Sequence, residues 1–151
     1  MKTMKLEHNN VQRTVDIITT LQRWLQILDF SFQDYLGALD RGVKYRVVIA
    51  KPAGKITFPD NVQALLAKPG FELRLSEEAL KINAAVFDEN EATINFFEGK
   101  SLMESPIIWT NHPGFIQMCQ DRFDRLWKSA EKCEIQNENN LQIAKRSSSN
   151  D

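Results

Sequence analysis

Three polar residues near the middle of the sequence have types and spacing that could serve catalysis. Asp88 closes the apolar run 82–87, and Lys81 and Asn83 alternate just upstream of it. Alternation along a strand places Lys81 and Asn83 on one face, with the carboxylate at the strand's end. Such an arrangement could be what remains of a catalytic motif. The structural alternative is that Asp88 only forms a turn by bonding the following backbone.

A second group of candidate residues surrounds a tryptophan further along the chain. Trp109 ends a short predicted strand and stands beside Thr110, Asn111 and His112. A tryptophan with polar neighbours can stack on a sugar or another ring, but it can equally fill the base of the following helix. Asn111 and His112 either contact a ligand or cap the helix that begins at Pro113. Lys81, Asn83, Trp109, Asn111 and His112 are therefore the predicted ligand-binding residues.

Other kinds of active site have little support in the sequence. The two histidines, His8 and His112, lie far apart, and neither Cys-x-x-Cys nor His-x-x-x-His spacing occurs. Gly54 and Gly70 stand alone, without the pattern of a phosphate-binding loop. There is no Gly-x-Ser-x-Gly nucleophile elbow. We therefore expect no metal, no cofactor and no catalytic residues, which favours a protein that is not an enzyme.

Composition and charge limit the partners. The 151 residues suffice for one domain, and 19 basic residues balance 20 acidic ones. This balance gives no global support for binding duplex DNA, and no run approaches the ~20 apolar residues of a membrane span. Cys119 and Cys133 fall in or just after one predicted helix, and fourteen helical residues would separate them by roughly 21 Å, too far for a disulfide. We expect reduced thiols in a cytoplasmic protein.

The hydrophobic pattern predicts a single α/β domain with a mixed, mainly parallel central sheet and helices on both faces. The first strand, helix and second strand follow with short joints, which is typical of a parallel βαβ unit. A polar leader (1–12), the domain itself (13–132) and a disordered tail (133–151) are expected. Predicted strands lie at 14–20, 43–50, 71–75, 82–87, 92–97 and 107–110, and predicted helices at 21–41, 60–67 and 113–132.

One charged residue on a predicted strand needs a partner if it faces the interior. Arg41, Lys44 and Arg46 surround the second strand and read as a solvated basic patch. If Arg46 instead points inward, it requires a carboxylate, and Asp16 on the first strand is the expected partner.

Four segments together resemble the phospholipase D superfamily. They are the first βαβ unit, RGVKYRVVIAKP, the hairpin VFDENEATINF and the final SPIIWTNHPGFIQMCQDRFDRLWKSA. More narrowly, they resemble the non-catalytic version that forms the effector-sensing C-terminal part of archaeal TrmB-type transcriptional regulators. The resemblance spans about residues 13–130. It implies a phospholipase D-like lobe, a small-molecule effector that could be a sugar, and pairing of two lobes as a homodimer.

The catalytic motif of that superfamily is His-x-Lys-x-x-x-x-Asp, in which the histidine attacks phosphorus. With the aspartate set on Asp88, the lysine position falls on Asn83 and the histidine position on Lys81. Both catalytic side chains are absent, so the resemblance implies a ligand-sensing domain without direct contact to nucleic acid or membrane. The alternatives are a residual phosphodiesterase or nuclease and a protein-interaction adaptor.

Overall fold

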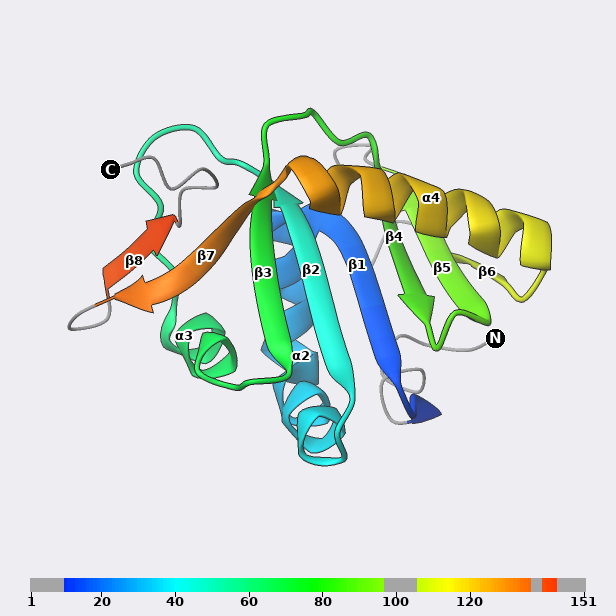
Figure 1. Ribbon diagram of the computed structural model, residues 1–151, viewed down its shortest axis with the longest axis horizontal. Helices are drawn as coiled ribbons and strands as arrows, with labels where there is room; N and C mark the ends of the chain where they lie inside the picture. Colours follow the sequence, from blue (N-terminus) through cyan, green and yellow to red (C-terminus); the bar gives the residue numbers. More distant parts are fainter. Residues whose placement is uncertain (1–9, 97–105, 137–139, 144–151) are drawn as a thin grey trace.

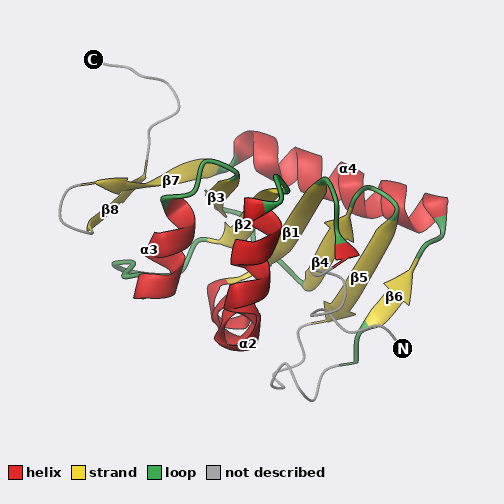
Figure 2. Ribbon diagram, turned by 90° about the horizontal axis from the view of Figure 1, so that it is seen from below, coloured by secondary structure: helices red, strands yellow, loops and turns green. Residues whose placement is uncertain are grey.

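The computed structural model describes residues 10–96, 106–136 and 140–143 of the chain. The described residues form one eight-stranded sheet, in which α2 and α3 cover one face and α4 crosses the other (Figures 1 and 2). The helices are α2 (Leu21–Asp40), α3 (Asp60–Leu66) and α4 (Pro113–Ser129). The strands are β1 (Thr14–Thr20), β2 (Lys44–Ala50), β3 (Phe71–Ser76), β4 (Ile82–Phe87), β5 (Glu91–Phe96), β6 (Ile108–Thr110), β7 (Glu131–Gln136) and β8 (Asn140–Ile143).

The sheet is mixed, with the strand order β6-β5-β4-β1-β2-β3-β7-β8. Parallel pairing joins β1 to β2 and β2 to β3, while the outer pairs on both sides are antiparallel. The α/β class and the helices on both faces agree with the prediction. The parallel part is confined to the three central strands, β1 to β3, and the other strand pairs of the described sheet are antiparallel.

Strands β7 and β8 differ from the sequence-based expectation of a disordered tail from residue 133. Helix α4 ends at Ser129, and the chain then turns into an extended strand that pairs antiparallel with β3, Arg74 opposite Lys132. Cys133 points into the core and is 4 % exposed, rather than lying at a fraying helix end. The edge of β3 that faces away from β2 offers backbone N–H and C=O groups, and β7 pairs with them. The mostly polar sequence of β7 gives no sign of this pairing.

Each face of the sheet has its own apolar core. On the α2 side, Trp24 and Leu28 pack with Tyr35, which stacks on Tyr45 of β2 at 4.6 Å between ring centroids. On the other side, the buried residues of α4 cover Ile18, Val48 and the β4 residues that share their face of the sheet, Ala84 and Val86. Each fully buried large side chain contributes about 1.5–3 kcal/mol. The two cores hold the sheet fixed between its helices.

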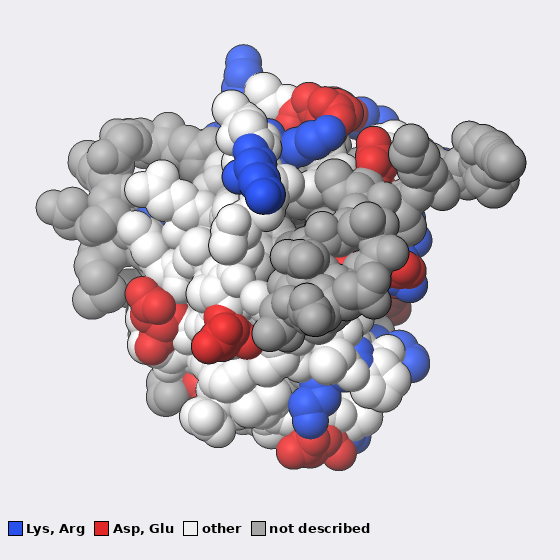
Figure 3. All heavy atoms as spheres, turned by 90° about the vertical axis from the view of Figure 1, so that its left-hand side faces the viewer, with Lys and Arg blue, Asp and Glu red and all other residues white. Residues whose placement is uncertain are grey.

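Charges are distributed without a dominant sign on the side of the molecule that carries β8 and α3. Figure 3 shows that lysine and arginine side chains of the described residues occur there together with aspartate and glutamate. In the described part of the chain, no helix has the length and apolar character needed to cross a bilayer.

Candidate functional site

Asp88 has a structural role at the turn between β4 and β5. Its Oδ1 accepts hydrogen bonds from the backbone N–H groups of Arg13 (2.6 Å) and Thr14 (3.0 Å), and its Oδ2 accepts one from Gln12 (2.9 Å). The carboxylate thus holds the chain that enters β1. Asp88 lies in a turn as expected, but its carboxylate bonds backbone 74–76 residues earlier instead of the backbone that follows it.

Lys81 and Asn83, the other two motif positions, lie in different environments. Lys81 is exposed and precedes the first residue of β4. Asn83 is 6 % exposed, and its Oδ1 accepts a hydrogen bond of 2.6 Å from the hydroxyl of Thr19 at the end of β1. The amide therefore belongs to the buried face of the sheet, whereas the lysine extends into solvent.

The antiparallel register of β4 and β5 places a second buried amide beside Asn83. Asn95 lies directly opposite Asn83, and Thr93 lies opposite Ala85 on the same face. Directly opposed side chains in such a pair have Cβ atoms about 4.5–5.5 Å apart. Asn95 and Thr93 are 2 % and 3 % exposed. The result is a polar strip on a sheet face that is otherwise apolar.

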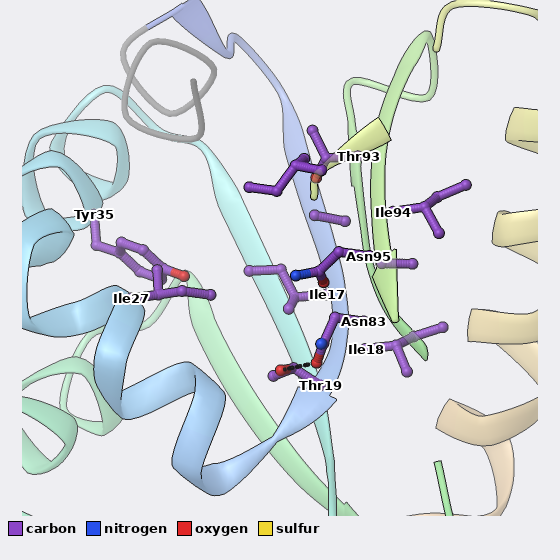
Figure 4. A pocket seen from close by; sticks show the side chains of 12 residues that line it. Ile17, Ile18, Thr19, Ile27, Tyr35, Asn83, Thr93, Ile94 and Asn95 are labelled. Carbon is purple, nitrogen blue, oxygen red and sulfur yellow. Dashed lines mark hydrogen bonds between the residues drawn. The ribbon is translucent and has the colours of Figure 1, made fainter. Parts of the chain in front are cut away.

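This strip lines a small cavity between the sheet and α2, which we call the amide pocket. Asn83 and Asn95 lie beside Ile17 in Figure 4, and Ile27 and Tyr35 of α2 face them across the pocket. The cavity has a volume of about 20 Å³, which is room for about one water molecule. Its lining residues are Ile17, Ile18, Thr19, Ile27, Tyr35, Asn83, Ala84, Ala85, Thr93, Ile94, Asn95 and Ile107.

Two hydrogen-bond donors in the amide pocket lack partners. Among the described residues, neither Asn83 Nδ2 nor Asn95 Nδ2 makes a hydrogen bond, and both atoms are buried. A buried donor without an acceptor costs about 1–3 kcal/mol. Burial raises the pKa of the Tyr35 hydroxyl, which therefore stays protonated at the pocket wall. The lining of the pocket contains no acidic or basic side chain, and it presents two amide hydrogen-bond donors.

The other predicted ligand-binding residues lie outside the amide pocket. Trp109 is half-buried opposite Thr93 in the β5–β6 pair, and its Nε1–H donates to Glu91 Oε2 at 3.1 Å. His112 caps α4, because its Nδ1 accepts the Gly114 N–H at 3.0 Å. Asn111 is exposed in the preceding loop. Of the five predicted residues Asn83 lines the cavity, and ligand binding by all five stays a prediction.

Sequence reasoning missed Thr19, Thr93 and Asn95 as pocket residues. A partial signal was present: Thr93 and Asn95 alternate, which places them on one strand face. The pairing of Asn95 with Asn83 depends on a three-residue turn, 88–90, with Phe87 opposite Glu91. A four-residue turn would have placed Phe96 opposite Asn83.

The opposite face of the sheet contains the Asp16–Arg46 ion pair, which the sequence analysis named as the alternative to a solvated Arg46. Arg46 donates from Nε and Nη2 to the two carboxylate oxygens of Asp16, at 2.8 and 2.7 Å. Gln120 of α4 donates to the same carboxylate at 2.9 Å. Hydrogen bonding to Asp16 raises the pKa of Arg46 above its usual value. Arg46 also lies over the rings of Phe123 and Trp127, so this cluster joins α4 to β1 and β2.

The described residues contain no group of three or more histidine, cysteine, aspartate or glutamate side chains placed to hold a metal ion.

Strand order, helix placement and the hairpin that carries Asn83 define a phospholipase D-like fold. Solved structures with this fold match the chain over most of its length. NucT from Helicobacter pylori matches with a TM-score of 0.67 at 11 % identity, covering 83 % of this chain and 86 % of NucT. Nuc, a phospholipase D family member from Salmonella typhimurium, matches with a TM-score of 0.62 at 13 % identity, covering 86 % and 88 %.

The archaeal chromatin protein TrmBL2 also matches, with a TM-score of 0.63 at 16 % identity over 83 % of this chain. The described "novel mode of DNA binding" is a property of TrmBL2. The match covers 47 % of TrmBL2, so this chain spans about half of that protein's length. Identities this low show a common fold. No protein-family model and no curated protein matches the sequence.

Proposed function

We propose that this chain is a non-enzymatic, ligand-sensing domain of a regulatory protein, and that the amide pocket is its sensing site. The observation that carries the proposal is the state of the three motif positions. An exposed lysine stands at the nucleophile's place, a buried amide stands at the lysine's place, and the aspartate is bonded to backbone.

Each of these features works against phosphodiester cleavage. Lys81 stands in place of the histidine that attacks phosphorus in the superfamily motif, and its side chain is exposed. Asn83 carries no charge to stabilise a phosphorane-like transition state, in contrast to the lysine of the superfamily motif. The Asp88 carboxylate already accepts three backbone hydrogen bonds. The remaining polar groups form a pocket suited to binding.

Ligand binding would regulate the protein by stabilising the folded domain or one arrangement of a domain pair. A ligand that binds the amide pocket stabilises the folded domain by mass action. If two domains pair, a ligand that prefers one arrangement of the pair shifts the population toward it. The proposal therefore includes a homodimer and a small-molecule effector such as a sugar, with no direct contact between this domain and nucleic acid.

The first test measures hydrolysis of bis(p-nitrophenyl) phosphate and of single-stranded and duplex DNA by the purified chain. We expect no turnover above buffer, in the parent chain and in Lys81→Ala alike. Turnover that Lys81→Ala or Asp88→Ala abolishes, in protein that remains folded, would establish a residual phosphodiesterase and refute the proposal.

The second test examines sensing directly. The thermal midpoint and the association state are measured with a panel of mono- and disaccharides, for the parent chain and for Asn95→Leu. At least one sugar should raise the midpoint of the parent chain, with the shift reduced in Asn95→Leu. A panel that leaves both quantities unchanged would count against the proposed sugar effector, and equal shifts in both proteins would place the site elsewhere.

A further inference from the structure

The amide pocket contains two buried hydrogen-bond donors that have no partner among the described residues. The Thr19 hydroxyl donates to Asn83 Oδ1, so that acceptor is already bonded. The Nδ2 groups of Asn83 and Asn95 remain, each on a side chain at least nine-tenths buried. Both side chains face α2 in Figure 4. A complementary group must therefore bring hydrogen-bond acceptors, since a ligand that brings donors would leave these amides unsatisfied.

The charge of the pocket restricts the acceptor further. None of the lining residues has an ionised side chain at neutral pH. A carboxylate or phosphate would lose its hydration on entry and would meet amide donors without a cation, which is strongly unfavourable. The group that enters the pocket is therefore uncharged. This conclusion separates the pocket from a site for phosphodiesters.

The size of the pocket determines how much of a ligand can enter. A volume of about 20 Å³ admits a group about as large as one water molecule. A terminal oxygen meets this limit, while the body of the ligand stays at the mouth.

We propose that the amide pocket binds an uncharged small molecule through a terminal acceptor oxygen placed between Asn83 Nδ2 and Asn95 Nδ2. This assignment rests on the proposed function of the pocket as the sensing site, and it names the chemical class of the group recognised there. The oxygen accepts from both amides and satisfies the two buried donors at once.

The test uses acetamide and acetate, which have nearly the same shape and differ in charge, together with inorganic phosphate. Each is added at millimolar concentrations, because ligands of a few atoms bind weakly. The side-chain NH₂ signals of Asn83 and Asn95 are followed in ¹H–¹⁵N spectra after assignment by substitution. Acetamide should shift both signals with saturation, whereas acetate and phosphate should leave them in place.

Variants locate the interaction. Asn95→Asp keeps the size of the side chain but replaces the donor by an acceptor, and should weaken acetamide binding by roughly tenfold or more. Asn90→Asp makes the same chemical change in the exposed turn and should have no effect. If Asn95→Asp does not fold, Asn95→Ser serves in its place and should also weaken binding.

The possible outcomes distinguish a failure of the uncharged-ligand assignment from a failure of the proposed sensing function. Shifts caused by acetate or phosphate and not by acetamide would overturn the uncharged-ligand assignment while keeping a ligand site. Acetamide shifts that persist unchanged in Asn95→Asp would also overturn it. If none of the three probes moves either signal, the assignment fails; the sugar panel described above then decides separately whether the sensing function fails with it.

Discussion

Asp16 and Arg46 form a two-pronged ion pair across β1 and β2, with both contacts shorter than 2.9 Å. Asp16 is 4 % exposed, while the Arg46 side chain keeps 39 % of its surface in contact with solvent. The pair lies under α4, where Gln120 adds a third hydrogen bond to the carboxylate. A buried carboxylate depends on such partners, so the pair is a sensitive point of the fold.

Asp16→Asn should lower the free energy of unfolding by about 2–3 kcal/mol. Breaking a fully buried ion pair costs about 3–5 kcal/mol, and the loss here should be smaller because Arg46 stays partly hydrated. Chemical denaturation measures the change. Asp124→Asn is the control: its carboxylate is 57 % exposed and 3.9 Å from Arg46, and its loss should cost less than about 1 kcal/mol. Equal losses in the two variants would contradict the assigned role of Asp16.

The hydrogen bond between Thr19 and Asn83 can be measured by a double-mutant cycle. Thr19→Val and Asn83→Leu each leave one buried partner unsatisfied, and each should cost about 1–3 kcal/mol. Together they should cost less than the sum, with a coupling of about 1–2 kcal/mol. Additive losses would show that the two side chains do not interact as the 2.6 Å contact indicates.

Removing the Asp88 carboxylate should loosen the start of β1. Asp88→Gly deletes three backbone contacts and should cost about 2–3 kcal/mol, since hydrogen bonds to a charged acceptor are the stronger ones. Amide hydrogen exchange of Arg13 and Thr14 should speed up more than exchange in β3. Exchange that stays unchanged at these two amides would contradict the contacts at 2.6 and 3.0 Å.

Glu89 follows Asp88 in the turn and has a φ of 62°, in the left-handed region. Its ion pair with Arg13 is long, at 4.0 Å, and exposed. Glu89→Gly should therefore be more stable than Glu89→Ala by about 1 kcal/mol, because only glycine takes this conformation without a steric cost. Thermal unfolding of the two variants side by side tests this, and equal midpoints would argue against the strain.

Cys133 should make the fold sensitive to alkali. Burial, with a smaller contribution from Glu131, raises the pKa of its thiol from 9.0 to about 12. Below pH 9 the thiol is protonated in both states; above it the unfolded chain loses the proton first, so stability falls as pH rises toward 12. The slope from this thiol is at most about 1.4 kcal/mol per pH unit.

The Cys133→Ala variant should show a shallower loss of stability than the parent chain between about pH 9 and 11, although its stability at neutral pH is lower because a cavity forms. Denaturant titrations at several pH values measure both slopes. Tyr35 and Tyr45, whose pKa values burial also raises, contribute equally to both proteins. Parallel pH profiles would contradict the assignment to Cys133.

The central fold could be predicted because its signals are local. Trp24, Leu28 and Tyr35 recur at the helical period and are fully buried in α2. The β-branched runs of β1 and β2 became the central strands. For Arg46 the sequence favoured a solvated patch. Asp16 could be named as its partner only under the rule that a charged side chain on an inward strand face needs a countercharge.

The features that sequence reasoning missed depend on contacts between distant segments. In EKCEIQ only Cys133 and Ile135 are apolar, so β7 is recognisable as a strand only once β3 is beside it. The amide pocket needs the register that pairs Asn83 with Asn95 and the packing of α2 over both. Polar residues within a strand do not by themselves show whether that face is covered.

The Asp88 contacts also bear on the order in which the chain folds. Two consecutive left-handed residues make the β4–β5 turn unfavourable on its own. The compensating hydrogen bonds come from residues 74–76 positions earlier in the chain. Forming them therefore carries the entropic cost of closing a long loop. The hairpin therefore gains its full stability only after β1 has docked, and it belongs to the late, non-local events of folding rather than to the nucleus.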